Sequence, residues 1–378
     1  MSAGQRLRTP FGEARLARYP LRRRETLRAW DAADEYLLDE LAGLGLGEGT
    51  RLLILNDSFG ALAVSLAALA PSSQGDSYTA HWSLRENLLA NGWPTDSVRV
   101  MTPLDGHRGE YDLVLVRVPK TLSLLEEQLL RLKPHLHGAS RVIGLGMARQ
   151  IHTSTLALFE AIVGPTHTSL ARKKARLIFS RPDPGRVARP SPYPSCYPLE
   201  GRGYRICNHA GVFSRERLDI GTRLLLGHIP ADPGLGDIVD LGCGNGVLGL
   251  LAAEANPRAR LHFTDESYLA LASARDNYQR CGSGGPAEFL ATDCLMGLAP
   301  ESADLILCNP PFHQQQTVGD FIAWRMFRQA GEVLRRGGAL RIVGNRHLNY
   351  HVKLKRLFGN LRQVAANPKF VVLEAIRE

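Results

Sequence analysis

Short apolar runs alternate with amphipathic segments through the first half of the chain. An apolar run of about four to eight residues between turn residues predicts a buried strand, and apolar positions three and four residues apart predict a helix. The predicted strands lie at 51–56, 98–101, 111–118, 141–145 and 175–180. The predicted helices lie at 30–41, 61–70, 121–132 and 152–162. Strands that alternate with helices favour a parallel sheet.

The second half follows the same plan. Its predicted strands lie at 237–241, 260–264, 288–291, 304–308, 339–343 and 370–376. Its predicted helices lie at 247–254, 268–280, 321–334 and 352–358. Both halves are therefore expected to be α/β domains with a central parallel sheet.

The two halves also match in detail. Arg141-Val142-Ile143-Gly144 resembles Arg341-Ile342-Val343-Gly344, and each run is followed by an arginine, a histidine and a helix that ends in an aromatic residue and a glycine. An acid and a proline lie 62 residues apart in the first half, at 57 and 119, and 70 apart in the second, at 240 and 310. We interpret this as an internal duplication.

Residues 181–203 interrupt the alternation. This stretch contains six prolines and three glycines. Such a composition is typical of a linker or an ordered crossing segment, so the domain boundary is expected here. The sequence thus predicts a first domain at 1–180, a Pro-rich linker at 181–203 and a second domain at 204–378.

Composition narrows the class of protein. The chain has 378 residues, of which 44% are hydrophobic and 22% charged, as in ordinary globular proteins. No apolar run is long enough to span a membrane and no signal-peptide pattern opens the chain. The six cysteines show no CxxC pair, which predicts neither a disulfide framework nor a metal site and favours a reducing cytoplasm.

The net charge of +9 is unevenly distributed. Residues 1–30 hold eight arginines against two acids, 172–189 hold seven basic residues against one acid, and 341–362 hold six with no acid. Three such clusters can form one surface that follows a phosphate backbone, or three unrelated solvated faces. The residues expected to bind RNA are Arg22, Arg23, Arg24, Lys120, Arg172, Lys173, Lys174, Arg346, Lys353 and Lys355.

The tetrapeptide Asn309-Pro310-Pro311-Phe312 follows the predicted buried strand 304–308. It suits methyl transfer to a planar exocyclic amine. The Asn309 side-chain oxygen and the Pro310 carbonyl would each accept one N–H of the amine, which localises its lone pair, and Phe312 would stack on the base. Positioning of this kind can contribute roughly 7–11 kcal/mol. The structural alternative is an Asn-Pro turn after a strand.

A glycine-rich turn, Asp240-Leu241-Gly242-Cys243-Gly244-Asn245-Gly246, joins strand to helix upstream. A dinucleotide fingerprint would need glycine at 247, which is valine. The turn instead resembles the first motif of S-adenosylmethionine-dependent methyltransferases. In that frame Asp265 would accept both ribose hydroxyls, with Glu266 as its rival, and Asp293 would accept the adenine amine beside Cys294.

The segment before the second domain's first strand is expected to cover the methionine end of the cofactor. Phe213 would lie over that end and Ser214 would hydrogen-bond nearby, unless Phe213 is a core residue. In the first half the glycine turn reads Asn56-Asp57-Ser58-Phe59-Gly60, with Phe59 filling cofactor space, and the counterpart of the tetrapeptide reads Val118-Pro119-Lys120-Thr121. We therefore expect the first half to be a copy of the fold that binds RNA but no cofactor.

Almost the whole chain resembles the ribosomal RNA guanine-N2 methyltransferases that have two tandem Rossmann-like class I methyltransferase domains. The stretches that carry the resemblance are 30–38, 53–62, 118–122, 151–156 and 309–315. The first-half stretches favour the large-subunit (23S) enzymes over the small-subunit (16S) ones. The resemblance implies S-adenosylmethionine as donor and guanine N2 of 23S rRNA as acceptor, in free RNA or an assembly intermediate. Because a fused duplicate often substitutes for a dimer, we expect a monomer.

Two other readings stay open at this stage. Related enzymes with tyrosine in place of Phe312 methylate a glutamine amide of release factors, or adenine in DNA. The duplicated half and the positive charge argue against a protein acceptor. The other reading is a non-catalytic RNA-binding assembly factor, against which the intact second-half motifs argue.

Overall fold

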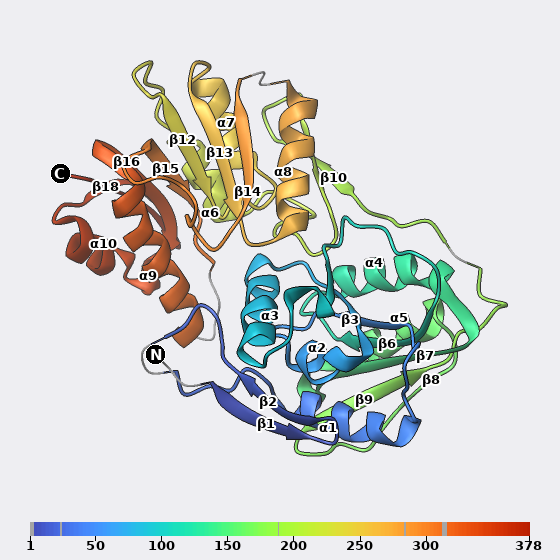
Figure 1. The fold of residues 1–378 in the computed structure, drawn as a ribbon. Helices are drawn as coiled ribbons and strands as arrows, with labels where there is room; N and C mark the ends of the chain where they lie inside the picture. Colours follow the sequence, from blue (N-terminus) through green and yellow to red (C-terminus); the bar gives the residue numbers. More distant parts are fainter. Residues whose placement is uncertain (1–3, 23–24, 188, 283–284, 312–315) are drawn as a thin grey trace. The chain divides into compact units, whose positions relative to one another are not determined.

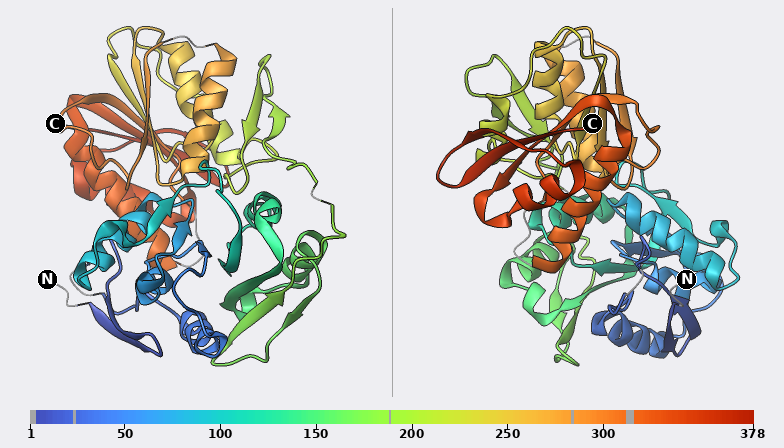
Figure 2. Two further views of the ribbon diagram at one scale, coloured as in Figure 1. Left: turned by 45° about the vertical axis from the view of Figure 1, so that its right-hand side comes forward. Right: turned by 90° about the vertical axis from the view of Figure 1, so that its left-hand side faces the viewer.

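The computed structural model describes residues 4–22, 25–187, 189–282, 285–311 and 316–378 (Figure 1). The chain divides into two compact units, Met1–Tyr193 and Pro194–Glu378. Each unit has a seven-stranded sheet with helices on both faces (Figures 1 and 2). The predicted fold class, two tandem Rossmann-like domains, is confirmed.

The sheet of the second unit has the order β14-β13-β12-β15-β16-β18-β17. Strands β14 to β16 are parallel, and β18 is antiparallel to both of its neighbours. The strands are β12 (Asp237–Leu241), β13 (Arg260–Asp265), β14 (Ala287–Ala291), β15 (Ala303–Cys308), β16 (Leu334–Asn345), β17 (Arg362–Ala366) and β18 (Phe370–Ile376). The chain adds strands outward from β12 to β14 and then, on the other side of β12, from β15 onward. Open α/β sheets bind ligands at the carboxyl ends of the strands beside such a switch in strand order.

Helices cover both faces of this sheet because alternate strand residues are apolar on each side. Ile238 packs with α7 (Val247–Ala255) and α8 (Tyr268–Cys281) on one face. Val239 and Leu241 pack with α9 (Gln316–Val333) and α10 (Tyr350–Phe358) on the other. A short helix, α6 (Ile220–Leu226), packs beside α7, β16 and β18. These helix layers bury β12 and β15, so that a ligand can contact these strands only at their ends.

The first unit repeats this topology strand for strand. Its sheet has the order β5-β4-β3-β6-β7-β9-β8. The strands are β3 (Leu52–Leu55), β4 (Ser72–Gln74), β5 (Arg99–Met101), β6 (Tyr111–Arg117), β7 (Leu136–Met147), β8 (Thr166–Thr168) and β9 (Ala175–Ser180). The helices are α1 (Ala32–Leu41), α2 (Ala61–Ser65), α3 (Tyr78–Ala90), α4 (Leu122–Leu132) and α5 (Thr153–Ile162).

Glycines at the start of α2 and α7 fix how the copies align. Gly60 and Gly246 are both N-cap residues with positive φ, 84° and 76°. A Cβ on Gly60 would lie 2.8 Å from Leu84, and one on Gly246 would lie 2.7 Å from Ala274. Leu84 and Ala274 are each the seventh residue of the following helix. Only glycine tolerates both the positive φ and the close approach.

This alignment corrects two predicted correspondences. With Gly60 matched to Gly246, the residue at the position of Asp240 is Ile54, whereas the sequence analysis matched Asp57 to it. Leu55 pairs with Val116, and Leu241 pairs with Cys308. The residue at the position of Asn309 is therefore Arg117, one before the predicted Val118. Each half has an acid near the end of its first sheet strand and a proline after the neighbouring strand, and the sequence pattern alone does not set how these residues align.

A β-hairpin precedes the first helix of each unit. In the first unit it is β1 (Gln5–Thr9) with β2 (Gly12–Leu16), and in the second it is β10 (Ser195–Pro198) with β11 (Arg205–Asn208). Strand β10 lies within 181–203, the stretch interpreted as linker, and the second unit begins at Pro194. The hairpins escaped the sequence analysis because Arg-rich and Pro-rich segments lack an alternating apolar pattern.

A disulfide joins Cys196 to Cys207 across the second hairpin. The two residues are direct partners in the antiparallel register, with Cα atoms 4.0 Å apart. The prediction that the cysteines form no disulfide is wrong for this pair. It was based on the absence of a CxxC motif, and cross-strand neighbours need no particular spacing in sequence.

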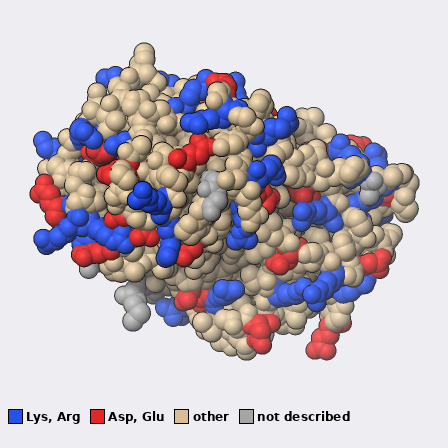
Figure 3. Space-filling view, turned by 90° about the horizontal axis from the view of Figure 1, so that it is seen from above, with Lys and Arg blue, Asp and Glu red and all other residues tan. Residues whose placement is uncertain are grey.

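Charged side chains of both signs are interspersed on the face shown in Figure 3. Within the described part of the chain, no helix is long and apolar enough to cross a membrane. The described residues also contain no group of three or more His, Cys, Asp or Glu side chains that could hold a metal ion.

Candidate active site

The glycine turn between β12 and α7 lies at the carboxyl end of the sheet, as predicted. Gly242, Gly244 and Gly246 have φ of 69°, 55° and 76°. A Cβ on Gly244 would meet nothing within 4 Å, so this glycine borders open space. The turn therefore exposes backbone at Gly244 for close approach of a ligand, while Gly246 is required for packing against α8.

Asp240, near the end of β12, contacts the start of α7 just after this turn. It is fully buried, and its Oδ2 accepts a hydrogen bond of 2.8 Å from the N–H of Gly249. Its Oδ1 has no hydrogen-bond partner among the described residues. Burial raises the pKa of Asp240 to about 8, opposed by the bond from Gly249. Its predicted cofactor role stays a prediction, and the structure gives it a structural contact with the start of α7.

Asp265 lies at the end of β13 beside the turn. Its Oδ2 accepts from the N–H of Gly244 at 2.9 Å and its Oδ1 accepts from the N–H of Ser267 at 2.9 Å. Desolvation, opposed by the two backbone hydrogen bonds and assisted by the nearby charge of Glu266, raises the pKa of Asp265 to about 6. The two backbone bonds fix the carboxylate and leave lone pairs for hydroxyl donors. Glu266 is exposed, so Asp265 is the better placed of the two rivals.

Asn245 points away from the open side of the turn. It is buried, and its Nδ2 donates to Asn208 Oδ1 at 2.9 Å and to the hydroxyl of Tyr197 at 3.3 Å. Cys243 is buried too, which raises the pKa of its thiol well above the usual value. Both residues therefore support the turn, and their side chains do not line its open side.

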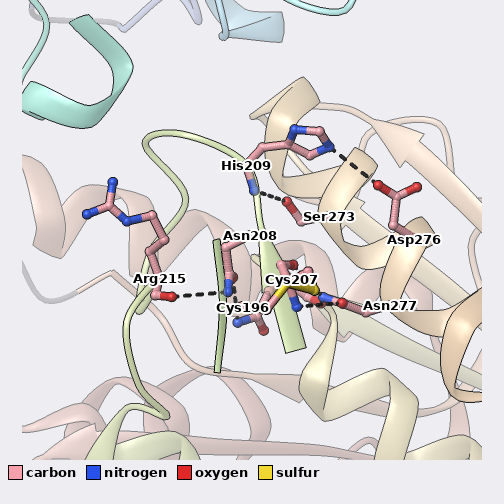
Figure 4. The surroundings of a disulfide bond; sticks show 9 residues. Cys196, Cys207, Asn208, His209, Arg215, Ser273, Asp276 and Asn277 are labelled. Atoms are coloured by element: carbon pink, nitrogen blue, oxygen red, sulfur yellow. Dashed lines mark hydrogen bonds and ion pairs between the residues drawn. A yellow bond between two sulfur atoms is a disulfide. The ribbon is translucent and has the colours of Figure 1, made fainter. Parts of the chain in front are cut away.

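Asn277 ties the turn to the hairpin. Its Oδ1 accepts from the N–H of Cys207 at 2.8 Å, and its Nδ2 donates to the carbonyls of Cys207 (2.9 Å) and Asn245 (3.0 Å). Figure 4 shows Asn277 beside the disulfide, with the Asn208 side chain bonded to the carbonyl of Arg215. The cross-linked hairpin thus forms part of the wall that supports the glycine turn.

Asp293 and Cys294 follow β14, as predicted. Asp293 is 6% exposed and forms an ion pair with Arg325 of α9. Cys294 has a φ of 58° and its thiol lies 3.5 Å from Asp293 Oδ1. Arg325, absent from the predicted site, holds the carboxylate. The predicted role of Asp293 as acceptor of an adenine amine stays a prediction.

Asn309 follows β15 and its side chain is held by the start of α6. Its Nδ2 donates to Thr222 Oγ1 at 2.8 Å and to Asp219 Oδ2 at 3.2 Å. Its Oδ1 is buried and has no hydrogen-bond partner among the described residues. Pro310 is buried. Phe312 lies outside the described residues, so its predicted stacking role stays a prediction.

The segment before α6 carries the predicted cover residues. Phe213 is 61% exposed, so the core interpretation of this residue is wrong. Ser214 has a φ of 57°. Asp219 and Thr222 lie at the N-cap and third position of α6 and were not predicted as site residues. The signal for them was an acid three residues before a threonine at a helix start, which marks a cap and not by itself a site.

The basic residues predicted to bind RNA are mostly exposed, but several are engaged in ion pairs. Arg172 lies 2.8 Å from Asp39 and Lys173 lies 3.1 Å from Glu35. Arg22 lies 3.7 Å from Glu25. Lys120, Lys174, Arg346 and Lys355 are exposed, and Lys353 is half-buried over the ring of Tyr350. Arg23 and Arg24 lie outside the described residues.

The same strand end looks different in the first unit. Arg117, at the position of Asn309, donates to Asp31 Oδ2 at 3.1 Å and pairs with Asp34. Gly75 stands at the position of Asp265, because Leu55 pairs with Gln74 as Leu241 pairs with Thr264. Phe59 stands at the position of Asn245, under the guanidinium of Arg18 at 4.7 Å. At these three positions the first unit thus has an arginine, a glycine and a phenylalanine where the second has Asn309, Asp265 and Asn245.

Comparisons with known proteins identify both domains and the fold. Residues 203–374 match the methyltransferase small domain and residues 4–184 match the RLMG N-terminal domain. The chain resembles a solved structure, the T. Thermophilus 16S rRNA N2 G1207 methyltransferase (RsmC) in complex with AdoMet and guanosine, with a TM-score of 0.76 over 99% of this chain and 98% of that one. Its 20% sequence identity establishes the fold alone.

The second unit is thus a methyltransferase domain with S-adenosylmethionine as its cofactor. The ribosomal RNA large subunit methyltransferase G of Stutzerimonas stutzeri is 53% identical over 98% of this chain and 99% of its own length. The protein of that name from Streptomyces avermitilis is 51% identical, over 98% of each chain. The chain belongs to this family, the ribosomal RNA large subunit methyltransferases G.

Proposed function

We propose that this protein transfers a methyl group from S-adenosylmethionine to the exocyclic N2 of a guanine in 23S rRNA. The observation that carries the proposal is the Asn309 amide, whose nitrogen is bonded to α6 while its oxygen has no partner among the described residues. A buried hydrogen-bond acceptor without a donor lowers the stability of the fold, unless a ligand donates a hydrogen bond to it. The names of the relatives support the RNA class, since both act on large-subunit rRNA by name.

The residues present fit the cofactor. Gly244 leaves room for backbone approach and Asp265 offers a fixed carboxylate to ribose hydroxyls. The bound cofactor supplies an electrophilic methyl on sulfur. The guanine amine would form its bond to that carbon as the carbon–sulfur bond breaks, and the surplus amine proton would then pass to solvent. Asn309 Oδ1 accepts one N–H of the amine, which turns the nitrogen lone pair toward the methyl group.

The acceptor base has to leave its stack to reach Asn309, as enzymes that modify bases require. The first unit and its basic residues serve as the RNA-binding platform in this proposal and hold no cofactor. The protein acts as a monomer in the cytoplasm, on free rRNA or on an assembly intermediate.

The test is transfer of label from S-adenosylmethionine to purified 23S or 16S rRNA stripped of protein. Label recovered from 23S rRNA as N2-methylguanosine is the expected result. Label in 16S rRNA would move the acceptor to the small subunit, and label in a release-factor peptide would overturn the RNA class. Cofactor binding without product on RNA or assembling particles would favour a non-catalytic assembly factor.

The matched variant is Asn309→Ala. It is expected to lower kcat by a factor on the order of a hundred or more, because the amine loses its acceptor, with cofactor binding unchanged. An unchanged kcat would overturn the role of Asn309. Asn349→Gly is the control, because Asn349 is an exposed N-cap residue of α10 whose side chain caps no backbone N–H and whose φ of 52° glycine adopts without strain.

A further inference from the structure

The start of α6 decides which way round the Asn309 amide lies. Asp219 Oδ2 is 3.2 Å from Asn309 Nδ2, and Thr222 Oγ1 is 2.8 Å from the same nitrogen. A carboxylate only accepts hydrogen bonds, so the amide nitrogen must face it and the amide oxygen must face away. We infer that Asp219 and Thr222 are positioning residues for methyl transfer, which present Asn309 Oδ1 to the acceptor amine. The inference rests on the proposed function.

Orientation matters because the two ends of an amide are opposites. A rotated Asn309 would present its own N–H groups to the N–H groups of the acceptor, and no hydrogen bond could form. The Asp219 carboxylate is itself fixed in place, because its Oδ2 also accepts from the backbone N–H of Thr222 (2.8 Å) and from the Thr222 hydroxyl (3.3 Å). The amide is therefore fixed before the substrate arrives.

The charge of Asp219 adds a second effect. A carboxylate bonded to the N–H side of an amide polarises the group and makes its oxygen a stronger acceptor. The acceptor amine gains positive charge as its bond to the methyl carbon forms. Because Asn309 Oδ1 is already a strong hydrogen-bond acceptor before the reaction, it stabilises that positive charge without having to reorganise.

The first unit shows that these two positions hold the strand-end residue as a feature of the fold. Asp31 and Asp34 are the N-cap and third residues of α1, as Asp219 and Thr222 are of α6. They bind Arg117, which stands at the position of Asn309. In the first unit, two carboxylates hold a cation. In the second, one carboxylate and a hydroxyl hold an amide and leave its oxygen without a described partner.

Helix capping is the competing explanation for Asp219, and it predicts no effect on turnover once the protein is folded. Asp219→Asn separates the two explanations, because asparagine caps a helix as well as aspartate does. It removes the charge and places a second reversible amide against Asn309. We expect kcat to fall by about tenfold in Asp219→Asn, with melting temperature and cofactor Kd unchanged.

Thr222→Val removes the nearer acceptor at nearly constant volume. We expect kcat to fall by about tenfold or more, while Thr222→Ser, which keeps the hydroxyl, retains most of the rate. Thr155→Val is the matched control, because Thr155 is the buried third residue of α5 in the first unit and contacts none of these groups. Its kcat should equal that of the unmodified protein.

These measurements use the full chain with 23S rRNA and labelled S-adenosylmethionine. A loss of kcat in Thr222→Val and Asp219→Asn, with rescue in Thr222→Ser, supports the inference. An unchanged kcat in both variants beside an inactive Asn309→Ala overturns the inference and leaves the proposed function intact. No product from the unmodified protein overturns the proposed function first. If Thr222→Val lowers the melting temperature, Asp219→Asn decides.

Discussion

Arg117 in the first unit and Asn309 in the second occupy the same point of the same sheet. Arg117 ends β6 and Asn309 comes directly after β15, the strands that pair with β3 and β12, and each is held by the N-cap and third residues of a helix. Arg117 forms ion pairs with two carboxylates. Asn309 ends in an oxygen that lacks a described partner. The fold provides a holder, namely two helix-start residues that bind the residue at this strand end. The identity of that bound residue decides whether the strand end carries an ion-paired cation or an amide oxygen that can accept a hydrogen bond from a ligand.

The copies also share a clamp that serves no ligand directly. Asn87 bonds the backbone of Ala17 and the carbonyl of Phe59, as Asn277 bonds Cys207 and Asn245. The clamp persists where the glycine turn has changed. Its role is therefore to fasten the hairpin to the sheet, and an asparagine there is no indicator of a cofactor site.

The largest effect is expected from Arg117→Ala. The change leaves Asp34, whose side chain is 2% exposed, as an uncompensated buried carboxylate, which costs about 3–5 kcal/mol of unfolding free energy. Hydrogen exchange of the α1 amides measures it. Arg141→Ala, at an exposed position of β7, is the control and should change little. A loss of unfolding free energy well below 1 kcal/mol, as for ordinary surface changes, would show that the ion pairs of Arg117 do not stabilise this strand end.

The next effect concerns the hairpins, of which only the second is cross-linked. Ala17 stands at the position of Cys207, since both donate their backbone N–H to the clamp asparagine. Replacing Cys196 and Cys207 by serine should lower the stability of the second unit by about 2–3 kcal/mol, because the short closed loop no longer restricts the unfolded chain. Denaturation with and without a dithiol reductant measures it. The serine variant should show no response to the reductant.

Asp265→Asn makes the second unit resemble the first, which has Gly75 at this position. Loss of the charged acceptor should weaken S-adenosylmethionine binding by roughly tenfold to a hundredfold. Calorimetric titration measures the Kd. Glu266→Gln is the control, and a larger effect there than in Asp265→Asn would exchange the two predicted roles.

The smallest effect is a pH dependence of the same binding. The raised pKa of Asp265, about 6 in the cofactor-free protein, means that cofactor affinity is full above pH 6 and falls as pH drops below it, by up to about tenfold per unit. The sign for stability is opposite: a raised folded pKa gives a contribution that is present at low pH and lost as pH rises through 6. Asp265→Asn should flatten the binding profile.

The sequence predicted the second unit well because its strands are continuous apolar runs. β12 and β18 have the predicted bounds, and β13, β15 and α8 differ by one residue at an end. Elements were missed in both units: β17 and α6 in the second, and β4, β8 and α3 in the first. β4 and α3 were missed, since β4 has only three residues with two serines and α3 carries polar residues around its circumference.

The site was predictable where a residue type has one common use and unpredictable where it depends on a distant partner. Three positive-φ glycines and Asp265 follow from the turn itself. The holder of Asn309 lies about 90 positions upstream, at a separation that no local pattern encodes. Arg117 was missed for the same reason, because the register of β3 with β6 and not the spacing of acids places it.

The identical strand order of the two sheets has a consequence for folding. During synthesis each copy offers strand edges whose natural partners also exist, in similar form, in the other copy. Tandem domains of this kind misassemble by exchanging such elements. The two copies have diverged at this strand end: in the first a cation lies between two carboxylates, and in the second an amide lies beside one carboxylate and a hydroxyl, so neither strand end matches the other copy's holder in charge.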